Sequence, residues 1–404
     1  MKISDIKVIV VGNPWKNWIF VKVMTDEGIE GLGECTGGLM TAPNRSAVEE
    51  LRSRLIGKNP ADIQGILEFT RKTLFLARGG NALSGIEMAC WDIVGKLCGK
   101  PLYQLLGGKV RESIRVYANG WYQGPRVPQM FAQKAKEMVE KGYTALKFDP
   151  FGKAYKFMGR EEEKKSEAIV KAVREAVGDE VDLMIEAHDR FSLSQAIRIG
   201  KMLEEYHPFW FETPVLSDNL EKISEVARRI PVPVIAGERS GNPRELARLL
   251  SMDAVDLVNP EILEIGGVLG LLDCFAIARG FDAYVAPHNA QSPYCTAANV
   301  HVGITQPNLL IQECFDDSSV SWTEQVLSGF PKVEKGYIKP TDSPGMGVTL
   351  CEEEAAKHPY GDKNFLWMFE EGWEQRRGNA SASLGYAKRR NEVTKFVSAQ
   401  HPQT

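Results

Sequence analysis

The sequence lacks the features of a disulfide-stabilised or membrane-spanning protein. Its seven cysteines are odd in number, widely scattered and without a C-x-x-C pair, so we predict reduced thiols that mostly serve packing. No apolar run approaches the roughly 18 residues needed to cross a bilayer. The N-terminus MKISDIKVIVVG is typical of a strand and lacks the apolar core and cleavage site of a signal peptide. We therefore expect a cytoplasmic protein without membrane contact.

The sequence also lacks an excess of positive charge. It holds 49 Lys and Arg against 53 Asp and Glu, a formal net charge of −4. Proteins that bind nucleic acid or anionic membranes usually carry a broad basic surface, so we expect neither partner. An anionic small molecule would have to be met by local positive charge, from a metal ion or a few basic side chains. The length of 404 residues favours a barrel-sized domain plus a second domain.

Residues 1–112 mix strands and helices. KISDIKVIVVG and WIFVKVMTDEG predict two strands, and helical spacing of apolar residues is found at 46–55 and 82–97. Strands followed by helices indicate a small α+β domain.

From residue 113 to about 325 the pattern becomes a repeat of short apolar strands, each followed by a helical stretch. Eight such units close into a parallel barrel. The predicted strands are IRVYANG, ALKFD, DLMIEAH, PFWFETP, VPVIAGE, AVDLVNPE, AYVAPH and NLLIQE, and predicted helices between them include residues 161–176, 192–205, 220–227, 243–250, 270–278 and 293–302. Residues 326–404 break the repeat; we expect them to return to the first domain and to end in a polar tail.

Polar side chains close the last seven strands of this repeat. They are Lys147, Glu186, Glu212, Glu238, Glu261, His288 and Glu313, spaced 23 to 39 residues apart. The carboxyl ends of barrel strands form one rim, and barrel enzymes carry their active sites there. We therefore expect these side chains to meet in one site.

Glu186, Glu212 and Glu238 come from three consecutive strands, so they are predicted to lie side by side. Three clustered carboxylates repel one another unless a cation or protons lie among them. Mg²⁺ prefers carboxylate oxygens and keeps positions open for water and substrate. Any one of these residues alone would more often be a helix N-terminal residue or a surface charge, but three at matching positions of a repeat predict a metal site.

Two of the six histidines end strands, and we predict both to be catalytic. His188 lies two residues beyond Glu186, which places both side chains on one face of an extended strand. His288 follows on the far side of the barrel mouth, and Glu261 on the preceding strand could accept its N–H. Imidazole suits proton transfer near neutral pH. The alternative is a histidine that only fills the core. The remaining four, His207, His301, His358 and His401, are predicted to be structural.

Lys147 and Asp149 close the second barrel strand, and Glu313 closes the last. Lys147 could hold developing negative charge beside a metal-bound carboxylate, or it could form an ion pair with a neighbouring acid. A protonated Glu313 could donate a hydrogen bond to a substrate oxygen. Together the groups predict removal of a proton next to a carboxylate, with an acid on the opposite side to protonate a leaving hydroxyl.

The sequence resembles the enolase superfamily, mandelate racemase subgroup, and most of all its galactonate dehydratase-type sugar-acid dehydratases. The motifs that carry this resemblance, over roughly the first 350 residues, are TDEGIEGLGE, IEMACWDIVGKLCGKPLYQLLGG, FETP, AGER, NPEILEIGGV, APHNAQSP and the closing QE. The resemblance implies an α/β fold: a (β/α)7β TIM-like barrel with an α+β capping domain formed by the N-terminal region and the C-terminal segment. It further implies a sugar acid as substrate and an assembly of identical subunits.

The resemblance also implies roles by position. Glu186, Glu212 and Glu238 match the Mg²⁺ ligands, and His288 with Glu261 matches the general base. His188 matches the acid that assists hydroxide departure, Lys147 matches the first lysine of a K-x-K pattern, and Glu313 matches an acid that hydrogen-bonds the substrate carboxylate. Substrate contacts are expected from Glu313, Asp149, Arg239 of AGER and Trp15. Residues 15–18 and 76–81 correspond to two mobile loops that close over substrate.

Several departures from the family pattern bear on the reaction. Asp149 replaces the second lysine of K-x-K, which counts against a two-base racemase and favours a dehydratase. Glu186 and Glu261 stand where relatives usually have Asp, and Thr213 replaces the second acid of E-E-P. We therefore expect a Mg²⁺-dependent aldonate dehydratase of the galactonate or gluconate type. A racemase, epimerase or cycloisomerase, or a non-catalytic relative with a binding role, stay open as alternatives.

Overall fold

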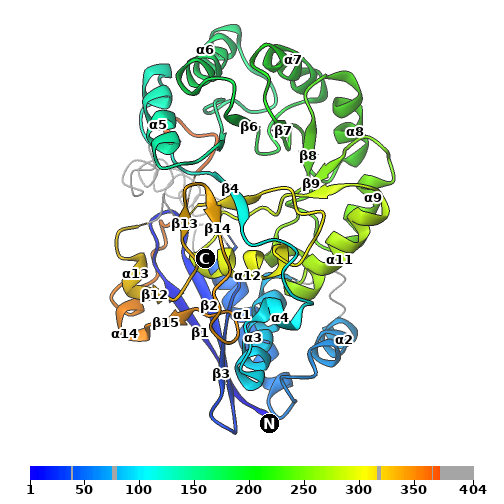
Figure 1. The fold of residues 1–404 in the computed structure, drawn as a ribbon, viewed down its shortest axis with the longest axis vertical. Helices are drawn as coiled ribbons and strands as arrows, with labels where there is room; N and C mark the ends of the chain where they lie inside the picture. The colour runs from blue at the N-terminus through cyan, green and yellow to red at the C-terminus, as the bar shows by residue number, and fades with distance from the viewer. Residues whose placement is uncertain (38–39, 75–79, 316–319, 366, 374–404) are drawn as a thin grey trace, which may run out of the picture.

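The protein consists of a barrel and a capping layer that covers one of its ends (Figure 1). The computed structural model describes residues 1–37, 40–74, 80–315, 320–365 and 367–373. Residues 76–79 of the second predicted loop and the whole of the predicted polar tail, from residue 378 on, lie outside the described residues.

Eight parallel strands form the barrel, and all eight were predicted. Hydrogen bonding joins neighbours in the order β11-β4-β5-β6-β7-β8-β9-β10, and a parallel bridge between Val285 and Leu309 closes the ring. The strands are β4 (Ile114–Ala118), β5 (Ala145–Phe148), β6 (Asp182–Glu186), β7 (Trp210–Glu212), β8 (Val234–Ala236), β9 (Leu257–Val258), β10 (Tyr284–Val285) and β11 (Gln312–Cys314). Seven helical connections and eight strands make this the (β/α)7β barrel that the sequence predicts.

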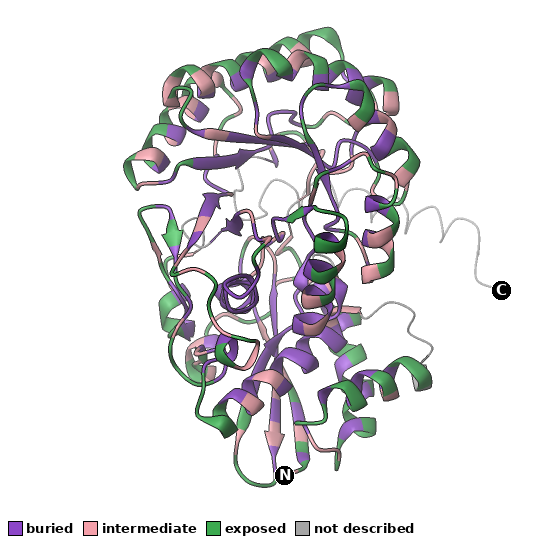
Figure 2. Ribbon diagram, turned by 45° about the vertical axis from the view of Figure 1, so that its right-hand side comes forward, coloured by how far each residue is buried: buried purple, intermediate pink, exposed green. Residues whose placement is uncertain are grey.

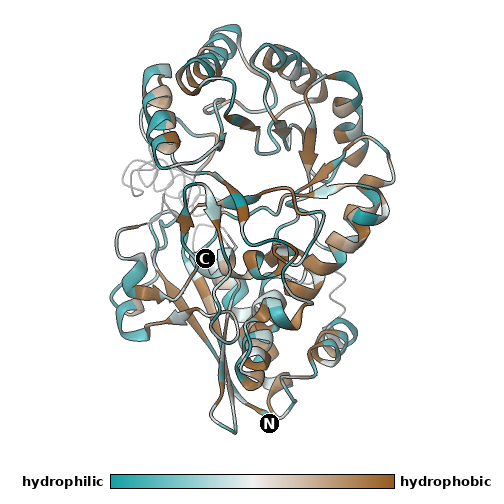
Figure 3. Cartoon of the chain, in the orientation of Figure 1, coloured by the Kyte–Doolittle hydropathy of each residue, from teal (hydrophilic) through white to brown (hydrophobic). Residues whose placement is uncertain are grey.

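Helices surround the barrel, and most have a polar face in solvent and an apolar face on the strands (Figures 2 and 3). The exception is α12, which is buried along its whole length. The six predicted barrel helices are confirmed to within about four residues at each end. The helices are α5 (Pro128–Glu140), α6 (Arg160–Val177), α7 (Leu193–Leu203), α8 (Leu220–Arg229), α9 (Pro243–Leu250), α10 (Ile262–Ile265), α11 (Gly267–Gly280) and α12 (Pro293–Gly303).

The barrel interior is filled by side chains, so any site must lie at one end. Its buried cluster comprises Tyr117, Ala145, Met184, Trp210, Ile235, Ala286 and Ile311. Tyr117 and Trp210 pack edge to face with ring centroids 5.6 Å apart. Such layers close the barrel to solvent and leave its carboxyl end for chemistry.

The cap contains a three-stranded antiparallel sheet and the four helices α1 to α4. Its third strand was not predicted, because EGLGE has little of the β-branched and aromatic character of strands. Glycine is needed there: a Cβ on Gly33 would lie 1.9 Å from the carbonyl oxygen of Gly85 in the helix packed against it. The elements are β1 (Ile3–Val11), β2 (Trp18–Thr25), β3 (Glu30–Glu34), α1 (Thr41–Leu55), α2 (Ile63–Leu74), α3 (Gly80–Cys98) and α4 (Leu102–Leu105).

Buried polar contacts fix the cap over the carboxyl end of the barrel. Glu87 of α3 accepts hydrogen bonds from the backbone N–H groups of Val268 (2.9 Å) and Leu269 (3.0 Å) at the start of α11. Glu34 of β3 accepts bonds from the backbone and hydroxyl of Ser292, which caps α12. Carboxylates at helix N-termini are favoured by the unpaired N–H groups there.

The C-terminal segment returns to the cap, as predicted, and also extends the barrel. Glu352 forms ion pairs with Lys7 and Lys22 of the cap sheet. The hairpin of β13 and β14 pairs antiparallel with barrel strand β4, a contact that was not predicted. The short elements are α13 (Thr323–Val326), β12 (Leu327–Ser328), β13 (Val333–Glu334), β14 (Tyr337–Ile338), β15 (Thr349–Leu350) and α14 (Glu352–Ala355).

Two further features agree with the predictions. All seven cysteines are unpaired, and five of them are buried. Within the described ranges, the helices are too short or too polar to pass through a bilayer.

His301, predicted to be structural, ties three parts of the chain together. This residue of α12 is fully buried. Its Nδ1 accepts a hydrogen bond from the backbone N–H of Tyr103, and its Nε2 donates one to the carbonyl of Met346; both distances are 3.3 Å. The bond from Tyr103 requires the neutral ring, because a protonated Nδ1 cannot accept a hydrogen bond. Burial lowers its pKa from 6.5 to about 4.

We predict that His301 makes the protein acid-sensitive. Between pH 6.5 and 4 the ring of His301 binds a proton in the unfolded chain but not in the folded protein. The contribution of His301 to the free energy of unfolding is therefore complete above pH 6.5 and is lost as the pH falls to 4. The loss amounts to about 3 kcal/mol. The difference in free energy of unfolding between wild type and His301→Gln, measured in urea by circular dichroism, should shrink by that amount from pH 7 to pH 4. A difference that does not change with pH would contradict this.

Candidate active site

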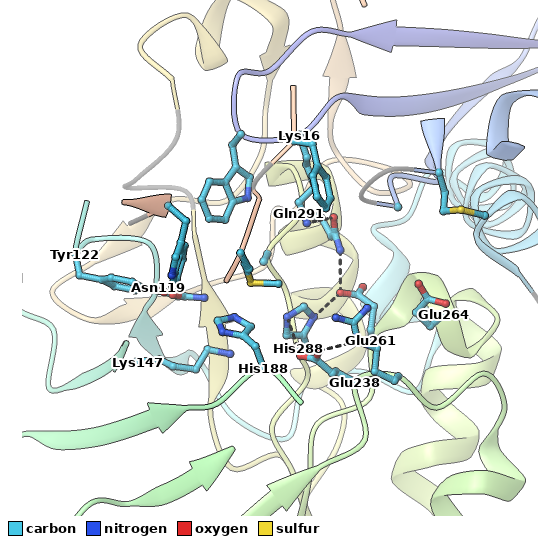
Figure 4. A pocket seen from close by; sticks show the side chains of 18 residues that line it. Lys16, Asn119, Tyr122, Lys147, His188, Glu238, Glu261, Glu264, His288 and Gln291 are labelled. Atoms are coloured by element: carbon cyan, nitrogen blue, oxygen red, sulfur yellow. Dashed lines mark hydrogen bonds and ion pairs between the residues drawn. The ribbon is translucent and has the colours of Figure 1, made fainter. Parts of the chain in front are cut away.

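A cavity of about 340 Å³ lies between the carboxyl end of the barrel and the cap (Figure 4). Five parts of the chain line it: the loop between β1 and β2, the segment between β3 and α1, the ends of barrel strands, the segments that follow them, and the C-terminal segment. Predicted site residues that line the cavity are Trp15, Lys147, His188, Glu238, Arg239, Glu261 and His288.

Glu186, Glu212 and Glu238 converge at one point of this site, as predicted. Each is buried, and one oxygen of each lies within 4.8 Å of the others. Glu186 and Glu212 are direct partners in the register of β6 and β7, and Glu238 follows β8. The repeat therefore brings three acids from neighbouring strand ends to one point.

This cluster fits a hard divalent cation. Thr213 donates a 2.7 Å hydrogen bond to Oε1 of Glu186 and so fixes the side chain, while Oε2 is buried and accepts no hydrogen bond from the described residues. Nζ of Lys147 lies 3.5 Å from this oxygen but is closer to Glu212 and Glu313, so a further cation would favour the buried charge. Thr213, which replaces an acid of the family pattern, thus orients a predicted ligand.

Lys147 supplies the positive charge beneath the cluster. Its Nζ lies 2.8 Å from oxygens of both Glu212 and Glu313 and 3.5 Å from Glu186. Burial alone would lower its pKa, but Glu212 and Glu313 outweigh burial and raise it well above 10.5. The ion pair considered for Lys147 is present, and the charged amine also faces the cavity.

One ammonium group does not neutralise the carboxylates. Burial and the neighbouring Glu186 raise the pKa of Glu212 well above its usual range. Burial alone would also raise the pKa of Glu238, but His288 and Arg239 lower it to about 2. The cluster therefore holds excess negative charge, which a divalent ion would balance.

His288 and Glu261 form the predicted pair. The parallel bridge between the two residues brings Nδ1 of His288 to 2.7 Å from Oε2 of Glu261, and Nε2 lies 3.3 Å from Oε2 of Glu238. Burial by itself would lower the pKa of His288, but Glu238, Glu313 and Glu261 raise it to about 9. Glu261 also caps α10 by accepting from the N–H of Leu263.

His188 also faces the cavity, but not for the predicted reason. Strand β6 ends at Glu186, and His188 and Asp189 adopt left-handed φ angles of 49° and 60°. Such angles are uncommon outside glycine. The turn is fixed because the N–H of His188 donates to Oε1 of Glu186 at 2.6 Å. Figure 4 shows His188 on the side of Lys147 and His288 on the side of Glu261 and Glu238.

The predicted substrate-binding residues divide into two groups. Trp15 and Arg239 line the cavity, and Nε of Arg239 lies 3.1 Å from Oε1 of Glu238. Asp149 and Glu313 are fully buried and are not among the lining residues. Asp149 is bonded to His188, so any influence on a substrate would be indirect.

Glu313 differs from the predicted protonated form. It accepts hydrogen bonds from Lys147, from the side chain of Asn119 and from the backbone N–H of Asn289. Burial alone would raise its pKa, but Lys147 and His288 lower it to about 2. It is therefore an ionised acceptor in this form of the protein.

Several lining residues were not predicted. Nζ of Lys16, in the first cap loop, donates to Gln291, and Gln291 donates in turn to Glu261; both distances are 3.2 Å. The C-terminal segment adds Phe365, Met368 and Trp373. All lie on loops, where no periodic pattern marks them; the only signal was that Lys16 adjoins Trp15 in a loop already expected to close the site.

Family comparisons cover most of the chain. A mandelate racemase / muconate lactonizing enzyme N-terminal domain matches residues 6–107, and an enolase C-terminal domain-like family matches residues 130–355. A D-gluconate/D-galactonate dehydratase from Picrophilus torridus is 36% identical over 89% of this chain and 93% of that protein. A D-galactonate dehydratase from Pectobacterium atrosepticum is 30% identical over 88% and 95%.

Solved structures agree with the sequence comparisons. The crystal structure of a mandelate racemase/muconate lactonizing enzyme from Sulfitobacter superimposes with a TM-score of 0.84 at 34% identity, covering 92% of this chain and 98% of that one. One family accounts for the two matched domains, for the barrel with its cap and for the buried acidic triad. The chain belongs to the mandelate racemase/muconate lactonizing enzyme family of the enolase superfamily.

Proposed function

We propose that this protein is a Mg²⁺-dependent sugar-acid dehydratase, a hydro-lyase that converts an aldonate into its 2-keto-3-deoxy acid. The observation that carries this proposal is the pair of histidines that enter one cavity from different sides, next to three clustered carboxylates (Figure 4). A base on one side and an acid on the other are what removal of water across two adjacent carbons requires.

Glu186, Glu212 and Glu238 would hold the metal ion. When bound, Mg²⁺ would supply positive charge for the substrate carboxylate and for the enediolate that forms from it. Lys147 lies beneath the same point and remains a cation because Glu212 and Glu313 flank it. It would attract the substrate carboxylate and stabilise the developing negative charge.

His288 would act as the base. Glu261 accepts its Nδ1–H. Without a metal ion, burial is outweighed by Glu238 and Glu313, which favour the protonated ring and raise its pKa to about 9. A divalent ion would offset these carboxylates and favour the neutral ring, whose Nε2 would take the proton from C2 of the substrate. His188 would act as the acid: it would give a proton to the C3 hydroxyl as the C3–O bond breaks, so that water leaves. The electron pair of the C2–H bond becomes the C2–C3 double bond, and the enol product then rearranges to the 2-keto acid.

The cavity wall would select the sugar acid. Trp15 and Lys16 from the cap and Arg239 from the barrel line the space beyond the reacting carbons. The dehydratases of gluconate and galactonate among the relatives support a six-carbon aldonate of this type. We further propose a homo-oligomer, as the family resemblance implies, and a cytoplasmic location, as the cysteine usage suggests.

A racemase or epimerase would need a second base opposite His288. That side carries His188 bonded to Asp149, where the family pattern has a lysine. This arrangement favours an acid for a leaving hydroxyl. A non-catalytic role is disfavoured because all the groups needed for the reaction are present and gathered in one cavity.

We predict that Mg²⁺ stabilises the protein. A cation that binds only the folded state at 100 times its Kd adds about 2.7 kcal/mol, so millimolar Mg²⁺ should raise the melting temperature by several degrees and EDTA should reverse the rise. The matched control is Glu212→Gln, whose melting temperature Mg²⁺ should change little. Equal melting temperatures of the wild type with Mg²⁺ and with EDTA would count against a metal site.

We also predict that substitutions of the two histidines affect removal of the C2 proton and loss of the C3 hydroxyl differently. The wild type should form keto acid from at least one member of an aldonate panel. His288→Asn should lose both dehydration and exchange of the C2 hydrogen with D2O. His188→Asn should lose dehydration by about 10²- to 10⁴-fold but retain the exchange, because the base is intact.

Keto-acid detection and NMR of deuterium at C2 measure the two rates. Unimpaired dehydration by His188→Asn would refute its role. Exchange at C2 by the wild type without loss of water from any aldonate would favour the racemase or epimerase instead.

A further inference from the structure

A second carboxylate–imidazole pair faces the first across the cavity. Nδ1 of His188 lies 2.6 Å from Oδ2 of Asp149, as Nδ1 of His288 lies 2.7 Å from Oε2 of Glu261. Each histidine therefore has one ring nitrogen engaged by a buried acid. The replacement of a family lysine by Asp149 is thus more than the loss of a base, because it provides a partner for His188.

Asp149 is itself held in place by contacts away from the cavity. It is fully buried at the end of β5, and its Oδ1 accepts a 2.9 Å hydrogen bond from the N–H of Phe151. Its Oδ2 is bonded to Nη2 of Arg190. Arg190 is also fully buried, and it donates to the carbonyls of Ala187 (2.8 Å) and Gly152 (2.7 Å) as well. A guanidinium fixed in this way compensates the buried carboxylate and prevents it from turning away.

The C-terminal segment packs on the same unit. Trp373 donates from Nε1 to the carbonyl of Gly152 at 3.0 Å, the carbonyl that Arg190 also contacts. Its ring meets that of His188 edge to face, with centroids 6.2 Å apart. His188 is therefore held at Nδ1 by Asp149, against its ring by Trp373 and at its backbone by Glu186.

We propose that Asp149, fixed by Arg190, is a positioning residue for His188 and keeps its Nε2 directed at the leaving hydroxyl. This inference rests on the proposed dehydratase function. The carboxylate accepts the Nδ1–H and thereby selects one tautomer and one ring orientation, as the carboxylate partner of a catalytic histidine does. The competing view is that Asp149 and Arg190 only stabilise the barrel.

The Asp149→Asn variant tests the proposal. An amide keeps the size of the side chain but weakens its hold on the Nδ1–H. Loss of such an orienting partner typically lowers activity about 10- to 100-fold. We expect kcat for dehydration to fall by that factor, KM to change little, and exchange of the C2 hydrogen with D2O to persist. Glu261→Gln, the matched change on the base side, should reduce dehydration and exchange together.

Two controls separate positioning from stability. Asp92→Asn removes a buried, ion-paired carboxylate of the cap; it should lower the melting temperature and leave the ratio of exchange to dehydration unchanged. Asp149→Asn should still be stabilised by Mg²⁺, which shows that the metal site is intact. If Asp149→Asn does not fold, Arg190→Lys should give a smaller loss of kcat with the same retention of exchange.

A spectroscopic measurement is independent of turnover. The sequence has six histidines, so ¹⁵N-histidine labelling with long-range ¹⁵N–¹H NMR can follow the ring of His188, assigned through His188→Asn. We expect a protonated Nδ1 in the wild type and loss of that preference in Asp149→Asn.

Wild-type kcat in Asp149→Asn, or an equal loss of exchange and dehydration, would overturn the proposal, as would an Nδ1 without a proton in the wild type. A wild type that dehydrates no aldonate but shows the Nδ1–H signal would instead refute the proposed function and leave the contact established.

Discussion

The site depends on how the protein compensates carboxylates that it buries. Glu186, Glu212, Glu238 and Glu313 are all removed from solvent around a single ammonium group, that of Lys147. Isolated buried charges are unstable, so each acid needs a hydrogen bond, a proton or a cation. Glu313 and Glu212 receive bonds from Lys147 and from Asn side chains, whereas Glu186 keeps one oxygen without a hydrogen bond from the described residues. The excess of buried carboxylates over nearby hydrogen-bond donors indicates a divalent ion at this point, and the substrate carboxylate would lie next to that ion.

The two sides of the cavity are built alike, and we propose that one serves a base and the other an acid. Each has a histidine whose Nδ1 is bonded to a buried acid, Glu261 on one side and Asp149 on the other. On the base side, Glu238 and Glu313 lie close to Nε2 of His288. On the acid side, Arg190 balances Asp149. The charges around the two imidazoles therefore differ, in keeping with the different roles that we propose for them.

Much of the architecture could be predicted because the barrel is periodic. Eight apolar strands, each ending in a polar residue, gave the strand order and placed the three acids on neighbouring strands. The third cap strand was missed because its glycines serve close contact with α3, which strand propensity does not reveal.

The finer features of the site depend on contacts between distant residues. Strand periodicity predicted that His188 and Glu186 share one face of an extended strand. In the structure, a left-handed turn and a hydrogen bond from the N–H of His188 to Glu186 determine its position instead. Lys16 and Trp373 come from loops that only the folded chain brings to the cavity. The ionised form of Glu313 follows from Lys147 and His288, which lie far from it in sequence.

The most direct measurement is a crystal structure of the protein soaked with Mn²⁺, with data collected at the manganese absorption edge. Mn²⁺ takes the same oxygen ligands as Mg²⁺ and can be located by its anomalous scattering. We expect one strong anomalous peak, within bonding distance of an oxygen from each of Glu186, Glu212 and Glu238, with Lys147 beside it. A fully soaked crystal with no peak there, or with the three side chains directed away from one another, would contradict the account.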